Sequence, residues 1–385
     1  MPRSSESNSF PKPRFLSPER TYSSSRIRSR AVYLFAVLVL VVTVIAIHSY
    51  SYALPSVASL APSRHFNLHK PPQSDKRPKN AEPEAVHIPG VRSKYAFATF
   101  LAGTTKELEY KDDNYLIATR ILSYQLLHAD ETRSRDRNIP FIVAVTDRVK
   151  EPARERLRKD GATVIEVPGL KADWLGPTIE SWEHVMTKLR LWELVDFERI
   201  AFVDADTILT EPLDDIFADP AVEERLTTVK IGSNIGNVQN NLPSSYVFAG
   251  NAEQQHEHHF PPTEEGRDWP NKAYLNAGFF VMKPDLALLQ HYIKVLNTAN
   301  SFDSSLPEQN LLNMVHDWKG AMPWQQLNTT LNIHYPKMAD IDGGAHSVHE
   351  KWWMGKGNVE DELAAWMRAW RWRMEGYFED MDQRQ

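Results

Sequence analysis

Two acidic side chains stand one residue apart in the stretch RIAFVDADTILTEPLDDIF, which begins at Arg199. The apolar run from Ile200 to Val203 ends directly before Asp204 and Asp206. A buried strand has no use for two carboxylates at its end, but both can reach one divalent cation, alone or with a phosphate. Such oxygen ligands suit Mg²⁺ or Mn²⁺. The pattern is also typical of an acidic turn that caps the next helix, so the neighbouring elements must decide between the two interpretations.

The elements around the acidic pair alternate between strands and helices. Apolar runs predict strands over 95–102, 140–146, 162–168 and 199–203, and helical spacing predicts helices over 113–129, 151–161 and 180–197. This alternation favours an α/β fold with a mostly parallel sheet covered by helices on both faces. Ligands of such open sheets bind at the carboxyl ends of the strands, where Asp204 and Asp206 lie.

The second half of the chain continues the pattern after an interruption. Residues 233–272 are polar, contain prolines and have no clear period, which predicts a long inserted loop. A further strand is predicted over 275–284 and a helix over 285–297. Residues 359–379 place apolar side chains three and four apart, which predicts an amphipathic helix that closes the domain.

Five segments resemble, in the same order along the chain, the motifs of family 8 glycosyltransferases, the family of glycogenin and galactinol synthase. The segments are MTKLRLW from Met186, VDADTILTEPLDDIF from Val203, LNAGFFVMKP from Leu275, SFDSSLPEQNLLN from Ser301 and AHSVHEKWW from Ala345. The resemblance covers roughly residues 95–355, and the ordered combination is far more specific than any one segment. It implies a single nucleotide-sugar-binding domain of the glycosyltransferase A type.

The resemblance also implies an activity and roles for particular residues. The activity is a metal-dependent transfer of a hexose from a UDP-sugar to a glycan, glycoprotein or glycolipid acceptor, with retention of the anomeric configuration. The implied ligands of Mn²⁺ (or Mg²⁺) are Asp204, Asp206 and His349. The implied catalytic residues are Lys188, Glu308 and Gln309, of which Glu308 or Gln309 would orient the sugar rather than form a covalent bond. The implied donor contacts are Thr99 and Tyr115 at the uracil, with Lys188, Ala205, Asn276, Gly278 and Lys351.

The late lysine of the family has two counterparts in this sequence. Lys351 lies two residues after His349 and Lys356 lies seven residues after it, so both remain candidates for the diphosphate contact. A cation and such lysines would neutralise the negative charge that grows on a departing nucleoside diphosphate. Glu308 stands where glycogenin has an aspartate, so its reach is longer by a methylene.

The first part of the chain predicts a membrane anchor. Residues 1–30 are basic, and residues 31–47 are apolar or neutral without a charge, a run that spans roughly 26 Å as a helix. The positive-inside rule then keeps residues 1–30 in the cytosol. The Pro-rich residues 48–92 predict an extended stem, and residues 93–385 the catalytic domain. A Golgi or endoplasmic-reticulum location follows, with the domain in the lumen. A cleaved secretory signal is the alternative.

Composition excludes several classes of function. The chain of 385 residues contains no cysteine, which removes disulfides, thiolate zinc sites and cysteine nucleophiles. Residues 1–94 carry fourteen Lys and Arg against five Asp and Glu, so the rest of the chain, whose total is −6, carries −15. A domain of that charge repels a phosphate backbone, which argues against nucleic-acid binding.

Two rival functions belong to other classes. The segment DADT also fits the first motif of haloacid dehalogenase-type phosphatases, but that motif belongs near the first strand of its domain and needs a later acidic partner. A membrane-anchored protein that binds nucleotide-sugars or glycans without turnover is the second rival. The histidines His256, His258 and His259 suggest a metal tract, although their polar loop favours a solvated surface.

Overall fold

The computed structural model describes residues 77–104, 112–175, 184–228, 242–354 and 359–384. These residues belong to one compact unit, Ser74–Gln385. The predicted membrane span 31–47 and the predicted stem up to residue 76 lie outside the described residues. Within the described ranges, no helix has both the length and the apolar character needed to cross a bilayer.

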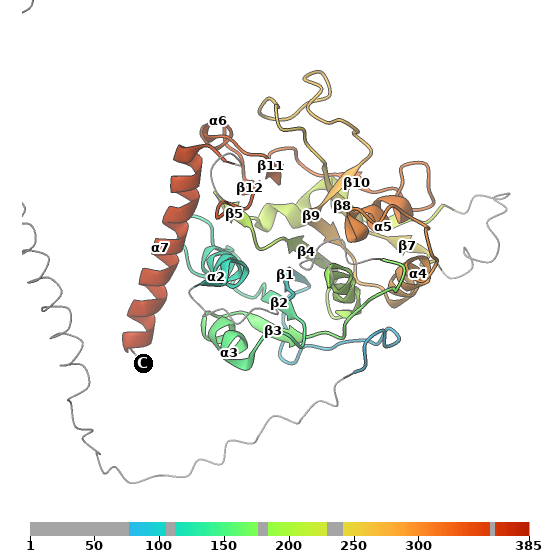
Figure 1. The fold of residues 1–385 in the computed structure, drawn as a ribbon, viewed down its shortest axis with the longest axis horizontal. Helices are drawn as coiled ribbons and strands as arrows, with labels where there is room; N and C mark the ends of the chain where they lie inside the picture. Colours follow the sequence, from blue (N-terminus) through green and yellow to red (C-terminus); the bar gives the residue numbers. More distant parts are fainter. Residues whose placement is uncertain (1–76, 105–111, 176–183, 229–241, 355–358, 385) are drawn as a thin grey trace, which may run out of the picture. The chain divides into compact units, whose positions relative to one another are not determined.

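A seven-stranded sheet forms the centre of the domain in the order β10–β8–β9–β4–β1–β2–β3 (Figure 1). Its strands are β1 (Tyr95–Leu101), β2 (Phe141–Val145), β3 (Thr163–Glu166), β4 (Arg199–Val203), β8 (Phe248–Ala252), β9 (Leu275–Met282) and β10 (Gln325–Gln326). Neighbouring strands are parallel except where β9 runs antiparallel to β4 and β8. The mostly parallel α/β sheet is therefore confirmed, as are the five strands predicted from apolar runs.

The prediction of a long loop over 233–272 was wrong in part. The segment contains β8, which is buried along its whole length and pairs with β9 on one side and β10 on the other. Its sequence, FAGNA, contains a glycine and an asparagine and shows no alternation. A strand buried on both faces has no polar side to alternate with, so pairing with distant strands forms β8 where the local pattern does not indicate it.

Two small sheets flank the central one. The first joins β5 (Thr207–Leu209), β12 (Ser347–His349) and β11 (Ile333–His334), and the second joins β6 (Arg225–Leu226) to β7 (Ser245–Tyr246). Strand β5 begins directly after Asp206 and runs antiparallel to β12, with Thr207 opposite His349. This pairing attaches a late segment of the chain to the end of β4.

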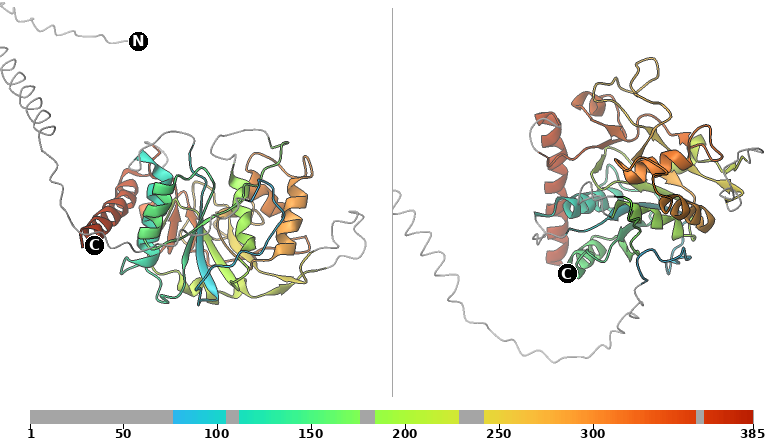
Figure 2. Two further views of the ribbon diagram at one scale, coloured as in Figure 1. Left: turned by 90° about the horizontal axis from the view of Figure 1, so that it is seen from below. Right: turned by 45° about the vertical axis from the view of Figure 1, so that its right-hand side comes forward.

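Helices cover both faces of the central sheet, as predicted (Figure 2). One layer contains α2 (Asn114–Leu127) and α3 (Glu151–Lys159), and the long α7 (Asp361–Arg384) packs against the outer side of α2. The other contains the 3₁₀-helix η3 (Val185–Glu193), α4 (Leu286–Leu296) and α5 (Pro307–Val315). The remaining short helices are η4 (Asp214–Ala218), η5 (Pro220–Val222) and α6 (Met338–Asp342). Successive side chains of β4 point to opposite faces of the sheet. Ile200 and Phe202 pack in the core beneath η3 and α4, and Ala201 and Val203 pack in the core on the other face.

The predicted helix over 180–197 is a 3₁₀-helix over Val185–Glu193, and residues 180–183 lie outside the described residues. Side chains three apart eclipse one another in this geometry, and Arg190 accordingly donates to Glu193 at 2.7 Å with both side chains fully buried. Met186 through Glu193 are all buried. An element buried on every side has no polar stripe, so its type was not predictable from amphipathic spacing.

The end of the predicted stem belongs to the surface of the domain. Arg77 donates two hydrogen bonds of 2.9 Å to the Glu193 carboxylate. The amide of Val86 donates to the Glu193 carbonyl at 2.8 Å, and Val86, Ile88 and Val91 pack against the core. The described residues 77–92 are therefore not a free linker.

Candidate functional site

The acidic pair lies at the carboxyl end of β4, as predicted. The amide of Asp204 donates to the carbonyl of Gly278 on the antiparallel neighbour β9 at 2.7 Å, and the amide of Thr207 closes the turn on the carbonyl of Asp204 at 3.1 Å. The side chain of Asp206 is buried, whereas that of Asp204 is 32% exposed. The turn therefore aims one carboxylate into the domain and leaves the other at the wall of a cavity.

His349 joins the acidic pair because β12 pairs with β5. Its Nε2 lies 3.2 Å from Asp206 Oδ1, and one ligand atom from each of Asp204, Asp206 and His349 lies within 4.8 Å of the other two. Two carboxylates and an imidazole are a suitable donor set for Mn²⁺ or Mg²⁺. The structure thus brings together all three predicted metal ligands, and their chemistry fits the predicted cation.

The close approach of His349 depends on a residue without a side chain. A Cβ added at Gly278 would lie 2.2 Å from His349 Cε1 and 2.8 Å from Nδ1. Contacts this short do not occur between unbonded carbon atoms, so only glycine at this position of β9 leaves room for the imidazole. Gly278 was predicted as a donor contact, and it lines the larger of two adjoining cavities.

The electrostatics of Asp206 and His349 are mutually dependent. Burial alone would raise the pKa of Asp206, but His349 and Lys351 lower it well below its usual range. Burial alone would lower the pKa of His349, but Asp206 raises it above the ordinary value. The Asp206 carboxylate therefore favours a proton on His349 in the metal-free protein, and a bound cation would take the place of that proton.

Lys188 is a buried ammonium between two carboxylates. Its Nζ lies 3.1 Å from Asp204 Oδ1 and 3.3 Å from Glu308 Oε1, donates to the carbonyl of Ala277 at 3.3 Å, and sits over the ring of Phe202. Burial raises the pKa of Glu308 to about 7; the charge of Lys188 opposes this rise, and that of Asp204 adds to it. One ammonium thus holds two carboxylates beside the cavity.

The Glu308 carboxyl predicts a pH dependence of stability. The pKa of Glu308 is higher in the folded than in the unfolded protein, so protonation of this carboxyl stabilises the fold. This contribution is complete below pH about 4.5 and is lost as the pH rises through about 7. Metal-free wild type should lose on the order of 2–3 kcal/mol relative to the Glu308→Gln variant between pH 5 and pH 8. Denaturant unfolding of both proteins at each pH measures this difference.

The control for this experiment is Glu265→Gln, which changes an exposed carboxyl in the same way. Its difference from wild type should be the same at both pH values. If the Glu308→Gln difference is also constant from pH 5 to pH 8, the raised pKa of Glu308 is wrong.

Of the two late lysines, Lys351 belongs to the described residues. Lys351 Nζ lies 3.2 Å from Asp206 Oδ2 with its side chain 40% exposed, and Asp206 raises the pKa of Lys351 above its usual value. Lys351 lines both adjoining cavities. Lys356 lies outside the described residues, so Lys351 is the late lysine that the described residues place at the acidic pair.

Two cavities meet at Lys188, Asp204 and Lys351. The larger, of about 400 Å³, is lined by eight of the predicted site residues, namely Lys188, Asp204, Asn276, Gly278, Glu308, Gln309, His349 and Lys351. The smaller, of about 190 Å³, is lined by residues 100–104, Tyr115 and the segment Asp204–Asp206, and so includes the predicted Ala205. The combined space is of the size that bound cofactors occupy.

The prediction for Thr99 needs a correction. Thr99 is completely buried within β1, its hydroxyl has no hydrogen-bond partner, and it lines neither cavity. The chain reaches the smaller cavity only at the end of the strand, from Phe100 to Thr104. Side chains inside a central strand face the packed layers, and only residues at its carboxyl end are open to a ligand.

Three functional candidates were missed from the sequence. Glu253 and His334 line the larger cavity, and Asn332 hydrogen-bonds the metal-ligand candidate His349 at 3.1 Å. The apolar run YVFAG before Glu253 is the one sequence signal that could have marked β8 and its end. Asn332 and Tyr335 adopt left-handed backbone with φ of 55°, which nothing in the local sequence indicates.

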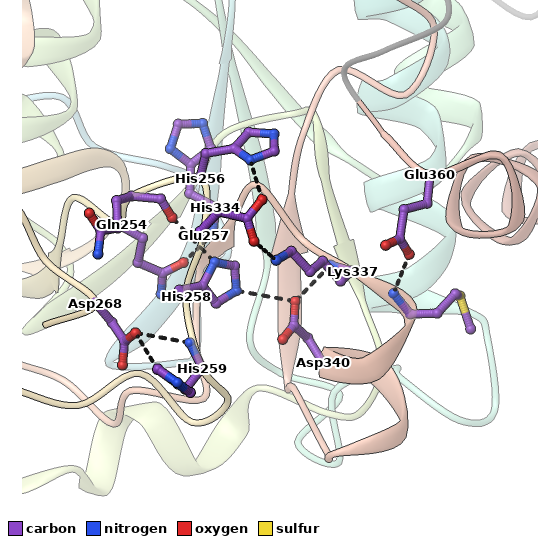
Figure 3. A network of polar contacts seen from close by, with 12 residues as sticks. Gln254, His256, Glu257, His258, His259, Asp268, His334, Lys337, Asp340 and Glu360 are labelled. Carbon is purple, nitrogen blue, oxygen red and sulfur yellow. Dashed lines mark hydrogen bonds and ion pairs between the residues drawn. The ribbon is translucent and has the colours of Figure 1, made fainter. Parts of the chain in front are cut away.

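The histidines 256, 258 and 259 do not form a metal site (Figure 3). His256 and His259 are exposed, but the His258 side chain is fully buried, 3.3 Å from Asp340. The hydrogen bond to Asp340 raises the pKa of His258. The prediction that these histidines are solvated is therefore wrong for His258, whose contact with Asp340 connects the loop to α6. Among the described residues, the metal-ligating side chains that gather are Asp204, Asp206 and His349.

Comparisons with known proteins agree with the family resemblance. A sequence model described as "Glycosyl transferase family 8" matches residues 110–350. An uncharacterised protein of Schizosaccharomyces pombe is 27% identical over 286 residues, which are 68% of this chain and 72% of that protein. Galactinol synthase 2 of Arabidopsis thaliana is 25% identical over 276 residues, which are 67% of this chain and 71% of that enzyme.

Among solved structures, the galactosyltransferase LgtC in complex with donor and acceptor sugar analogs is similar over 71% of this chain and 95% of its own, at 14% identity and a TM-score of 0.43. The apo form of mouse xyloside xylosyltransferase 1 is similar over 67% of this chain and 97% of its own, at 15% identity and a TM-score of 0.40.

Proposed function

The chain belongs to glycosyltransferase family 8, and on that premise we propose that it transfers a hexose from a UDP-sugar to a hydroxyl group of a glycan. We propose further that the reaction requires Mn²⁺ or Mg²⁺ and retains the anomeric configuration of the donor. The observation that supports this most directly is the convergence of Asp204, Asp206 and His349 at the junction of two cavities.

The charges around this junction suit a diphosphate leaving group. A divalent cation at the three ligands would supply positive charge against the two phosphates. Lys188 and Lys351 add fixed positive charge on either side of Asp204 and Asp206, at distances of 3.1 and 3.2 Å from the respective carboxylates. Positive charge that is already in place stabilises the negative charge that grows as the bond to the diphosphate breaks.

The two cavities suit different parts of the proposed donor. The smaller cavity, with Tyr115 and the backbone of residues 100–104 in its wall, is suited to a nucleoside. The larger cavity, with Asn276, Glu308 and Gln309, is suited to the sugar. In the transfer, the anomeric carbon loses its bond to the diphosphate and gains one to the acceptor oxygen, while the acceptor proton passes to the diphosphate.

Retention is proposed to arise from attack on the same face that the diphosphate leaves. The contacts of Glu308 and Gln309, the two candidate nucleophiles, support this proposal. Glu308 is held by Lys188, and the Gln309 side chain accepts from the amide of Ala277 at 2.9 Å and donates to Glu253 at 3.3 Å. Both side chains are therefore suited to orient the sugar.

The test is a screen of nucleotide-sugars for slow donor hydrolysis by the fragment from Ser74 onward, in the presence of Mn²⁺. We expect release of UDP from one UDP-hexose, its loss on addition of a chelator and its return with excess Mn²⁺. Analysis of the released sugar by NMR reports the configuration. Tight UDP binding without hydrolysis or transfer of any donor would support the alternative, a nucleotide-sugar-binding protein without turnover.

The predicted location is part of the proposal. We propose a single-pass membrane protein of the Golgi or endoplasmic reticulum, anchored by residues 31–47 with the catalytic domain in the lumen. The support is the basic flank of this apolar run. A C-terminal epitope should be protected from protease in intact microsomes and lost after detergent. Digestion without detergent would contradict this topology.

A further inference from the structure

The carboxylate of Glu253 lies at the end of β8 and accepts hydrogen bonds from three side chains. Its Oε1 accepts from His334 Nδ1, and its Oε2 accepts from Asn276 Nδ2 at 2.8 Å and from Gln309 Nε2 at 3.3 Å. Burial alone would raise the pKa of Glu253, but these hydrogen bonds lower it. The group is therefore ionised and can only accept.

The orientation of the Asn276 amide follows from its partners. The backbone N–H of Gly278 donates to one end of this amide at 3.0 Å. A backbone N–H can only donate, so this end is the oxygen, and the other end is the NH₂ group that donates to Glu253. The Asn276 oxygen also accepts from Asn332 Nδ2 at 3.0 Å. The oxygen of the Asn332 amide must then face His349.

This chain of donors and acceptors determines where two imidazoles carry their protons. Asn332 Oδ1 lies 3.1 Å from His349 Nδ1 and can only accept, so Nδ1 carries a proton and a neutral His349 has its lone pair on Nε2, toward Asp206. Glu253 Oε1 imposes the same arrangement on His334, whose ring lines the larger cavity. A metal-ligating imidazole depends on such a partner for its tautomer.

We propose that Glu253 is a positioning residue that holds the Nδ1 proton of His334, and that Asn332, oriented by Asn276, is a positioning residue that holds the Nδ1 proton of His349. His349 Nε2 is then free for the cation, and His334 Nε2 accepts a hydrogen bond from a substrate hydroxyl. The hydroxyl contact rests on the proposed function, because the hydroxyl would belong to the donor sugar or to the acceptor. The proton positions do not depend on it.

The Glu253→Gln variant tests the first half of the proposal without a change of shape. Asn276 stays fixed by the Gly278 amide, so its NH₂ group takes the oxygen of the introduced carboxamide. The introduced NH₂ group then faces His334 Nδ1, which must accept, and the His334 proton moves to Nε2. His349 keeps its tautomer, because the Gly278 amide still orients Asn276 and, through it, Asn332.

The readout is ¹⁵N NMR of histidine-labelled, metal-free protein at a pH where the ring is neutral, with the His334 signal assigned by its absence in His334→Gln. We expect Nδ1–H at His334 in wild type and Nε2–H in Glu253→Gln, with Mn²⁺ affinity within about 3-fold of wild type. A purely structural role of Glu253 would alter the melting temperature but not the tautomer. Nε2–H at His334 in wild type, or Nδ1–H in the variant, would overturn the proposal.

A pair of substitutions at Asn332 tests the second half. Asn332 has a φ of 55°, which glycine adopts without strain, so Asn332→Gly removes the acceptor of His349 without distorting the backbone. We expect its affinity for Mn²⁺ alone to fall about 10–100-fold, the range for partners of metal-ligating histidines. Asn332→Asp keeps the acceptor toward His349 Nδ1 but loses the donor to Asn276 Oδ1, so its affinity should fall less than that of Asn332→Gly.

These measurements use Mn²⁺ without any nucleotide-sugar, so their result is separate from that of the donor screen. Wild-type Mn²⁺ affinity in Asn332→Gly would refute the role of Asn332 even in a fully active transferase. If instead no donor is turned over but the Glu253 and Asn332 variants behave as expected, the positioning roles stand and the proposed reaction fails.

Discussion

Asp206→Asn should abolish Mn²⁺ binding and lower donor turnover by about 10³-fold or more, the loss expected when charge stabilisation of the leaving group is removed. Asp206 is 5% exposed and contacts both His349 and Lys351 at 3.2 Å. The substitution keeps the shape of the side chain. It removes a ligand charge from the cation and the counter-charge from two basic groups.

The measurements are Mn²⁺ titration by calorimetry and the rate of UDP release. Asp215→Asn is the matched control, because it removes a carboxylate charge that is exposed and paired with Arg135. The control should bind Mn²⁺ and turn over donor as wild type does. A melting temperature for each variant separates loss of the site from loss of the fold. Undiminished hydrolysis by a folded Asp206→Asn protein would show that the metal assignment is wrong.

Gly278→Ala should disrupt the same site through sterics alone, without a change of charge. The new methyl group would lie 2.2 Å from His349 Cε1 and 3.0 Å from Asn276 Oδ1. The imidazole cannot easily yield, because its ring is buried, β12 holds its backbone, and Asn332 holds its Nδ1. We expect Mn²⁺ affinity to fall about 10–100-fold and donor turnover to fall with it.

The control for this substitution is Gly376→Ala on α7, where an added Cβ meets no atom within 4 Å. The control should bind Mn²⁺ normally and gain about 1 kcal/mol of stability, since alanine is the better helix former. Mn²⁺ titration and denaturant unfolding of both variants test the pair. Normal Mn²⁺ affinity in Gly278→Ala would mean that His349 is not held where the structure places it.

The elements that were predicted well are those whose residues carry a complete local pattern. Strand β4 was predicted to the residue, because its run of buried apolar side chains ends abruptly at the acidic turn. Helix α2 was predicted because its apolar residues recur at helical spacing, and Asp113 caps it by accepting from the amides of Tyr115 and Leu116. Such features depend on residues close together in the chain, so the sequence alone shows them.

The elements that were missed depend on distant partners. Strand β8 is stabilised by β9 and β10, and its short sequence resembles a loop, so Glu253 at its end was missed with it. Thr99 was predicted as a donor contact from a resemblance, but a shift of one residue along the strand separates the packed Thr99 from Phe100, where the lining of the smaller cavity begins. The contact of Lys351 with Asp206 likewise joins distant parts of the chain, and no local pattern indicates it.

The sequence by itself determined the chemical groups of this protein: an acidic pair after a buried strand, a late imidazole, a lysine on each side, and the order of motifs that marks the family. Only the tertiary structure decided how they meet. The antiparallel pairing of β5 with β12 sets Thr207 opposite His349, and Gly278 on β9 leaves the space that the imidazole fills. Side-chain type and local period are properties of neighbouring residues, whereas strand pairing and close contact follow from the packing of the whole chain.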